Sequence, residues 1–122
     1  MTGPTALVVD EPLSLWGGVD PATGEVIDVH HPQRGANISG RVLVMPAGRG
    51  SSSSASVLAE AVRAGTAPVA ILLGEPDLIL SIGSAVAEEL YGVRVPVVVL
   101  PSDRIGAIVD GQPVGRDLLG GR

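Results

Sequence analysis

The segment Met45–Ser56, with the sequence MPAGRGSSSSAS, combines five serines, two glycines and an arginine. It follows a strand-like run and precedes a helix-like one, so its hydroxyls and backbone N–H groups would lie at the amino end of a helix. Such an end attracts carboxylates and phosphates, because its N–H groups are unpaired and the helix dipole favours negative charge. Gly48 and Gly50 allow a close backbone approach, and the Arg49 guanidinium can hold a carboxylate at two points. These residue types indicate a loop that binds a small anion.

Other interpretations of the same loop stay open. A serine-rich helix cap without a ligand explains Ser51–Ser54 equally well, because serine is a preferred capping residue. None of the known fingerprints fits this loop. No Lys follows Gly50 as in a P-loop, and a dinucleotide-binding loop would need a third Gly. The G-x-S-x-G spacing of a hydrolase nucleophile elbow is also absent. A linker between domains is disfavoured, since too little chain lies on either side of the loop.

The composition excludes several kinds of chemistry. The 122 residues include 8 Arg and no Lys, which removes Schiff-base chemistry and a P-loop lysine. Without Cys the chain offers neither a disulfide nor a thiolate ligand for zinc or an iron–sulfur cluster. A net charge of −5 argues against nucleic acid or an anionic membrane as a partner. No signal peptide is visible at the start, so we expect a soluble cytoplasmic protein.

The hydrophobic pattern predicts one α/β domain. Aromatic residues make up only 2% of the chain, so the core must consist of Val, Leu, Ile and Ala. Strands are predicted at residues 5–9, 25–29, 41–45, 69–73 and 95–100, and helices from the serine loop to Gly65, from residue 81 to Gly92, and over residues 102–109. The alternation of strand and helix indicates right-handed parallel crossovers, with helices on the faces of a small sheet.

Two spacings mark the helices. Ala55, Leu58, Ala61 and Val62 fall on one helical face. Ile82, Val86 and Leu90 follow one another at intervals of four in the second helix. Glu60 and Arg63 lie away from the first face.

Other polar or aromatic residues are expected to have structural roles. His30 and His31 are adjacent and diverge in direction, so they make a poor metal pair, and we expect turn packing and hydrogen bonding instead. Trp16, beside two glycines, is expected in a loop as an interface anchor. The remaining assignments are Asp20 and Asp28 as turn caps, Glu88 and Glu89 on a solvated helix face, and Arg34 and Arg41 at the surface.

Four blocks in order resemble the small subunit of the aconitase X family: WGGVDP followed by TG, HHP, GRGSSSS and VAEELYG. The likeness extends from Leu7 to Leu100. It implies that residues 1–122 form one swivelling β/β/α domain like the mobile domain of aconitase. It also implies an iron-dependent dehydratase whose large part, fused or separate, holds the iron or iron–sulfur cluster on its cysteines together with most of the substrate pocket. This chain would bind no metal itself and would be inactive without that partner, in a heterodimer.

The resemblance also implies roles for the serine loop. Ser51, the first serine after the glycine, corresponds to the proton-abstracting base, and Arg49, Gly50, Ser52 and Ser53 would contact the substrate. An unperturbed hydroxyl is a very poor base at neutral pH, so its alkoxide would need stabilisation by amides, a helix end and a cation such as Arg49. The partner's iron would withdraw the leaving hydroxyl.

The run of serines resembles the bacterial branch of the family, for which the implied reaction converts cis-3-hydroxy-L-proline into a pyrroline-2-carboxylate. The alternative substrate is mevalonate 5-phosphate. A third hypothesis is a non-catalytic anion-binding or regulatory domain. Relatives of this kind carry another strand's worth of residues before Leu7, so we expect a truncated N-terminal strand that leaves a sheet edge unpaired, and a flexible tail over residues 111–122.

Overall fold

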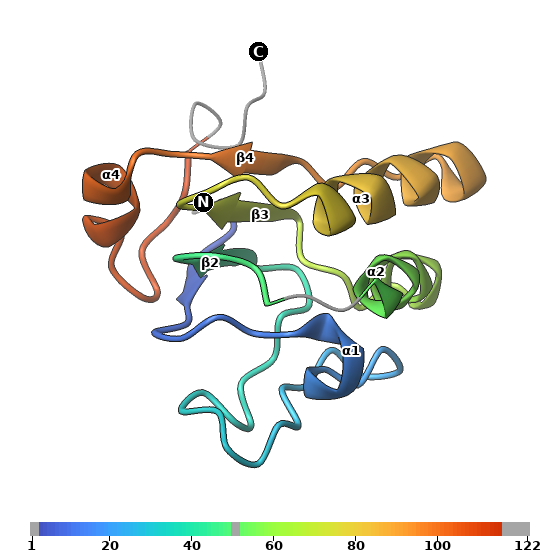
Figure 1. Ribbon diagram of the computed structural model, residues 1–122, viewed down its shortest axis with the longest axis horizontal. Coiled ribbons are helices and arrows are strands. Elements are labelled where there is room, and N and C mark those ends of the chain that lie inside the picture. The colour runs from blue at the N-terminus through green and yellow to red at the C-terminus, as the bar shows by residue number, and fades with distance from the viewer. Residues whose placement is uncertain (1–2, 50–51, 116–122) are drawn as a thin grey trace.

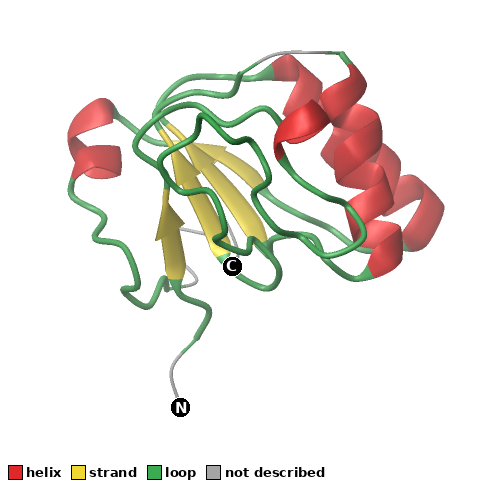
Figure 2. Cartoon of the chain, turned by 90° about the horizontal axis from the view of Figure 1, so that it is seen from below, coloured by secondary structure: helices red, strands yellow, loops and turns green. Residues whose placement is uncertain are grey.

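The computed structural model describes residues 3–49 and 52–115. A four-stranded sheet lies between helices α2 and α3 on one face and helix α4 on the other (Figure 1, Figure 2). The elements are β1 (Ala6–Val8), α1 (Leu15–Gly18), β2 (Val42–Met45), α2 (Ser53–Ala64), β3 (Ala70–Leu73), α3 (Leu78–Tyr91), β4 (Val97–Val99) and α4 (Ser102–Gly106). This arrangement confirms the predicted α/β class with helices on both faces.

The strands are parallel and neighbour one another in chain order, β1-β2-β3-β4. β2 and β3 are buried along their whole length, which is why their sequences are unbroken aliphatic runs. In open α/β sheets a ligand crevice arises where the strand order reverses. The four described strands show no reversal, so their order alone opens no crevice at the carboxyl ends.

Alternate side chains of the strands build two cores. Leu43, Met45, Ile71 and Leu73 pack with α2, α3 and residues 13–38 on one face. Their neighbours Val42, Val44, Ala70 and Leu72 pack against α4 and the residues that follow it. In α2 three residues of the predicted face, Leu58, Ala61 and Val62, are buried, whereas the fourth, Ala55, is only partly buried. Gly65 and Gly92 end α2 and α3 in the left-handed conformation, as predicted.

The prediction of a strand at residues 25–29 is wrong. This part of the chain makes only isolated bridges, from Val26 to Val19 and from Glu25 to Asn37. Turns on either side reverse the chain too soon for a longer ladder. They are closed by Asp20, which accepts a hydrogen bond from the Ala22 N–H, and by Asp28, which accepts one from the His30 N–H, both at 2.9 Å. The two aspartates are therefore turn caps, as expected.

The outer edge of β1 is covered, contrary to the expectation of an unpaired edge. The N–H of Ala6 donates to Gln112 O at 2.8 Å, and the N–H of Val114 donates to Pro4 O at 2.9 Å. Val114 also enters the second core. Residues 111–114 thus pair with β1 instead of forming part of a flexible tail. Residues 116–122 lie outside the described part of the chain.

Helix α3 forms where a helix is predicted but begins at Leu78, three residues before the predicted start, and the apolar residues that reveal it point outward. Ile82, Val86 and Leu90 are 46%, 41% and 62% exposed. The buried side instead carries Leu80, Gly83 and Ala87. The predicted helix at 102–109 is shorter, ending at Gly106. Among the described residues, no helix is long and apolar enough to cross a membrane.

Candidate functional site

The loops that follow β2 and β3 lie against each other at the carboxyl edge of the sheet. The N–H of Gly74 donates to Pro46 O at 3.1 Å. A Cβ built on Gly74 would lie 2.7 Å from that same oxygen, so the contact requires a residue without a side chain. This contact brings the start of the serine loop beside the start of α3.

Gly48 and Asp77 make a second close contact between the two loops. The Asp77 carboxylate caps α3, its Oδ1 accepting a hydrogen bond from the Leu80 N–H at 2.9 Å. A Cβ on Gly48 would lie 1.9 Å from the other carboxylate oxygen, Oδ2. We expected Gly48 to make room for a ligand, but the structure shows that it makes room for Asp77. Sequence reasoning missed Asp77, although an Asp directly before an apolar helical run is a known start signal.

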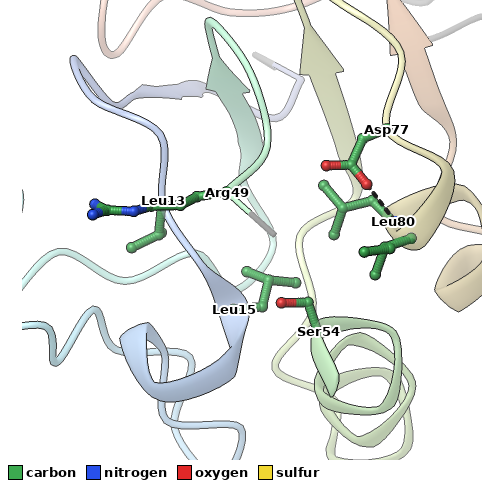
Figure 3. Close-up of a pocket in the computed structure, with 7 residues that line it drawn as sticks. Leu13, Leu15, Arg49, Ser54, Asp77 and Leu80 are labelled. Atoms are coloured by element: carbon green, nitrogen blue, oxygen red, sulfur yellow. Dashed lines mark hydrogen bonds between the residues drawn. The ribbon is translucent and has the colours of Figure 1, made fainter. Parts of the chain in front are cut away.

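A crevice lies between these loops and the segment before α1 (Figure 3). Its walls are mainly apolar, from Leu13, Leu15, Ile79 and Leu80. Three polar side chains join them: Arg49, Ser54 and Asp77. The space is too narrow to admit even a water molecule.

The serines of the loop have different surroundings. Ser54 is buried, and its Oγ accepts a hydrogen bond from the Trp16 N–H at 3.3 Å, which ties α2 to α1. Ser52 stands at the N-cap of α2 and is exposed, and its side chain makes no capping hydrogen bond. Ser53 is exposed in the first turn. The predicted base Ser51 and the predicted contact residue Gly50 lie outside the described residues.

Arg49 is exposed, and Figure 3 shows its side chain directed past Leu13 and away from Asp77. Its guanidinium therefore lies on the open side of the crevice and does not neutralise the Asp77 carboxylate. The amino ends of α2 and α3 follow β2 and β3, and so they lie at this same edge. Their partial positive charge complements an anion that approaches Arg49 from outside.

The perturbed pKa values among the described residues lie elsewhere, on α2. A hydrogen bond from Arg63 lowers the pKa of the Glu60 carboxyl, and the same contact raises the pKa of Arg63. Both groups are solvent-exposed, so screening keeps the pair weak. It takes no part in the crevice.

His31 has the structural role expected of it. The side chain is buried, its Nδ1 accepts a hydrogen bond from the Gln33 N–H at 3.0 Å, and its Nε2 donates to Glu11 O at 3.1 Å. Both ring nitrogens are therefore occupied. Within the described residues, no three His, Cys, Asp or Glu side chains converge as a metal site.

The remaining candidates are placed as follows. Trp16 is 59% exposed in α1, where it and Gly17 have non-helical backbone angles, so the segment is a turn, as expected. Its role as an interface anchor stays a prediction. Arg41 is only half-buried, and its Nη2 donates to Ala6 O at 2.6 Å. Arg34, Glu88 and Glu89 are exposed, as expected.

Together the fold and this edge define a small α/β domain that carries a serine-rich loop where a parallel strand leads into a helix. The model of the aconitase X swivel domain family matches residues 2–117, and the chain belongs to that family. The crystal structure of Thermococcus kodakaraensis aconitase X in its holo-form agrees with this. It matches with a TM-score of 0.78 and 32% identity, over 90% of this chain and 81% of that one. The predicted resemblance and the swivelling-domain fold are confirmed.

Two kinds of curated relative are similar in sequence. The cis-3-hydroxy-L-proline dehydratase of Pseudomonas aeruginosa is 56% identical over 88 residues, which are 72% of this chain and 15% of that one. The phosphomevalonate dehydratase small subunit of Methanothermobacter thermautotrophicus is 40% identical over 112 residues, 91% of this chain and 81% of that one. The chain thus spans only a small part of the first relative's length.

Proposed function

We propose that this chain is the small, swivelling part of an aconitase X-type hydro-lyase that removes water from a small hydroxy acid, with cis-3-hydroxy-L-proline as its substrate. The observation that carries the proposal is the 56% identity to the Pseudomonas aeruginosa cis-3-hydroxy-L-proline dehydratase. A second dehydratase of that name, from Hypocrea jecorina, is 48% identical over the same length. The product would be a pyrroline-2-carboxylate.

The proposal includes a large subunit that completes the site, in a cytoplasmic heterodimer. The match covers only 15% of the Pseudomonas enzyme, so most of that enzyme lies outside it. In the present chain the crevice is too narrow for a substrate, and Arg49 points outward from it. Both features suit a surface that forms one wall of a pocket.

The proposal assigns iron, or an iron–sulfur cluster, to the large subunit. The residues described here do not fit such a group, since the sequence has no Cys and no three potential ligands converge within residues 3–49 and 52–115.

In the proposed reaction Ser51 takes a proton from the carbon next to the substrate carboxylate. The electron pair of that C–H bond forms the new C=C bond, and hydroxide leaves the neighbouring carbon. The proton and the hydroxide together make up the released water. Arg49, the loop amides and the amino end of α2 would stabilise the serine oxygen as an alkoxide and hold the substrate carboxylate. Ser52 and Ser53, both exposed at the start of α2, would contact the substrate beside them.

The second candidate substrate is phosphomevalonate. It is favoured by the longer match to the Methanothermobacter small subunit, which covers 91% of this chain. The same small part would then face a larger anion, with Arg49 as the nearest described cation at the crevice.

The test is co-purification with the large subunit encoded in the same genome, followed by assay with both substrates. We expect turnover of cis-3-hydroxy-L-proline by the complex and none by this chain alone. Turnover of phosphomevalonate alone would replace the substrate assignment. Turnover by the isolated chain, or by the large subunit without it, would overturn the proposal.

A further inference from the structure

The outer surface of α2 and α3 is unusually apolar for a face in contact with water. Leu78, Ile82, Val86 and Leu90 follow one another along α3, with exposures from 41% to 74%. Spacing by four keeps them on one side of the helix. Single exposed apolar residues are ordinary, but a continuous row marks an interaction surface.

A groove of about 420 Å³ runs beside this row, between the two helices. Its α2 wall consists of Ala55, Ser56, Ala59 and Glu60, and its α3 wall of Ile82, Val86, Leu90 and Tyr91. Three of the four α2 residues are Ala or Ser, so the α2 wall is low beside the larger side chains of α3. We call these eight residues, with Leu78, the outer helical groove.

Gly83 sets the shape of the groove. A Cβ at this position would lie 2.9 Å from the Ala55 Cα and 3.0 Å from its carbonyl oxygen. The two helices can therefore lie side by side in close contact, as Figure 2 shows. This close packing turns the outward sides of both helices into one surface.

We propose that the outer helical groove is a docking surface for the large subunit. The inference rests on the proposed function, because the occupant is the large subunit of that enzyme. The 88 matched residues are only 15% of the Pseudomonas enzyme, so in an enzyme of that kind a much larger part is available to contact this domain. Its contact has to include the serine loop in order to complete the site.

The groove is continuous with that loop. Leu78 directly follows the crevice residue Asp77, and Ala55 directly follows the crevice residue Ser54. A body that covers the crevice therefore also meets the end of the groove that lies at the amino ends of α2 and α3. Trp16, whose backbone N–H donates to the Oγ of the crevice residue Ser54, is also exposed.

The groove also carries little charge. The ionisable side chains that line the groove are Glu60, already paired with Arg63, and the phenol of Tyr91. Interface cores are depleted in charged residues and enriched in aromatic ones. The groove thus suits a partner that presents aliphatic and aromatic side chains.

The experiment measures binding of the small chain to the immobilised large subunit from the same genome by biolayer interferometry. The variant is Ile82→Lys with Val86→Lys. The matched control is Val29→Lys with Val109→Lys, which adds the same charge at two exposed valines outside the groove. Circular dichroism melts of each variant check that it folds. We expect the groove variant to weaken binding by about 30-fold or more, since two aliphatic contacts are lost, and the control by less than about 3-fold.

Steady-state turnover separates this inference from the proposed function. When the groove variant is titrated into the large subunit, the half-saturating concentration should rise while the turnover at saturation stays that of the wild type. A complex that binds as described but turns over neither substrate would refute the proposed function alone. Unchanged binding by the groove variant would overturn the docking surface. The proposal would also be overturned if the wild-type chain forms a dimer through this groove and the two groove substitutions abolish that dimer while binding to the large subunit stays unchanged.

Discussion

The contact between Gly48 and Asp77 can be tested by adding one methyl group. In Gly48→Ala the new Cβ would start 1.9 Å from Asp77 Oδ2 and would have to reach at least 3.4 Å for ordinary contact. Asp77 cannot simply turn away, because its Oδ1 holds the Leu80 N–H at 2.9 Å. Either the α3 cap breaks or the serine loop moves.

The expected cost follows from these two routes. Loss of an N-cap costs about 1 kcal/mol, and overpacking of a tight contact about 1–3 kcal/mol. For a domain of this size, that corresponds to a fall in Tm of about 4–12 °C. Differential scanning calorimetry of the purified chain measures it.

A double variant identifies the cause. Asp77→Ser keeps a capping hydroxyl but removes the carboxylate that the methyl group would strike. In Gly48→Ala with Asp77→Ser, at least about 1 kcal/mol of the loss should therefore be recovered relative to the sum of the two single variants. Strictly additive losses, or an unchanged Tm in Gly48→Ala, would refute the close packing of the two loops.

Three further outcomes are expected. Gly83→Ala should lower the free energy of unfolding by about 1–3 kcal/mol, because its methyl group meets the Ala55 backbone; Gly106→Ala, with open space around it, is the control, and equal urea midpoints would contradict the prediction. His31→Leu should cost about 2 kcal/mol or more in urea unfolding, because it leaves the Gln33 N–H and Glu11 O without their partner; a wild-type midpoint would remove His31 from that role. In the reconstituted enzyme, Arg49→Ala should raise KM about 10-fold or more, since a charge-assisted contact to the substrate carboxylate is lost; an unchanged KM would exclude that contact.

The buried strands were predictable because they pack on both faces. β2 and β3 are unbroken aliphatic runs that turns delimit on either side, so local sequence determines them. The same holds for α2, whose predicted face is the buried one. The family was recognisable from four blocks of sequence before any contact was known.

The errors have a common physical origin in contacts between distant parts of the chain. Residues 111–114 pair with β1 across more than a hundred positions, and their short Gly- and Pro-containing sequence gives no sign of it. The strand predicted at 25–29 fails for a different, local reason, since the turns on either side limit it to isolated bridges.

The exposed row on α3 and the Gly48–Asp77 contact show two further limits of prediction from the sequence. Periodicity identifies the apolar side of a helix but not what covers it, so Ile82 and Val86 give the same pattern whether they face a core or a partner. Gly48 and Asp77 are brought together only by the pairing of β2 with β3. A glycine next to Arg49 therefore suggested a ligand where the structure has a carboxylate.

The central claim is that Ser51 supplies the base in a site shared with the large subunit. The direct measurement is kcat of the reconstituted complex carrying Ser51→Ala, beside Ser54→Ala, whose hydroxyl accepts the Trp16 N–H instead. Removal of a general base should lower kcat by about 100-fold to 10,000-fold, with assembly of the complex unchanged, whereas Ser54→Ala should stay within about 3-fold of the wild type. A Ser51→Ala complex that keeps wild-type kcat would contradict the account.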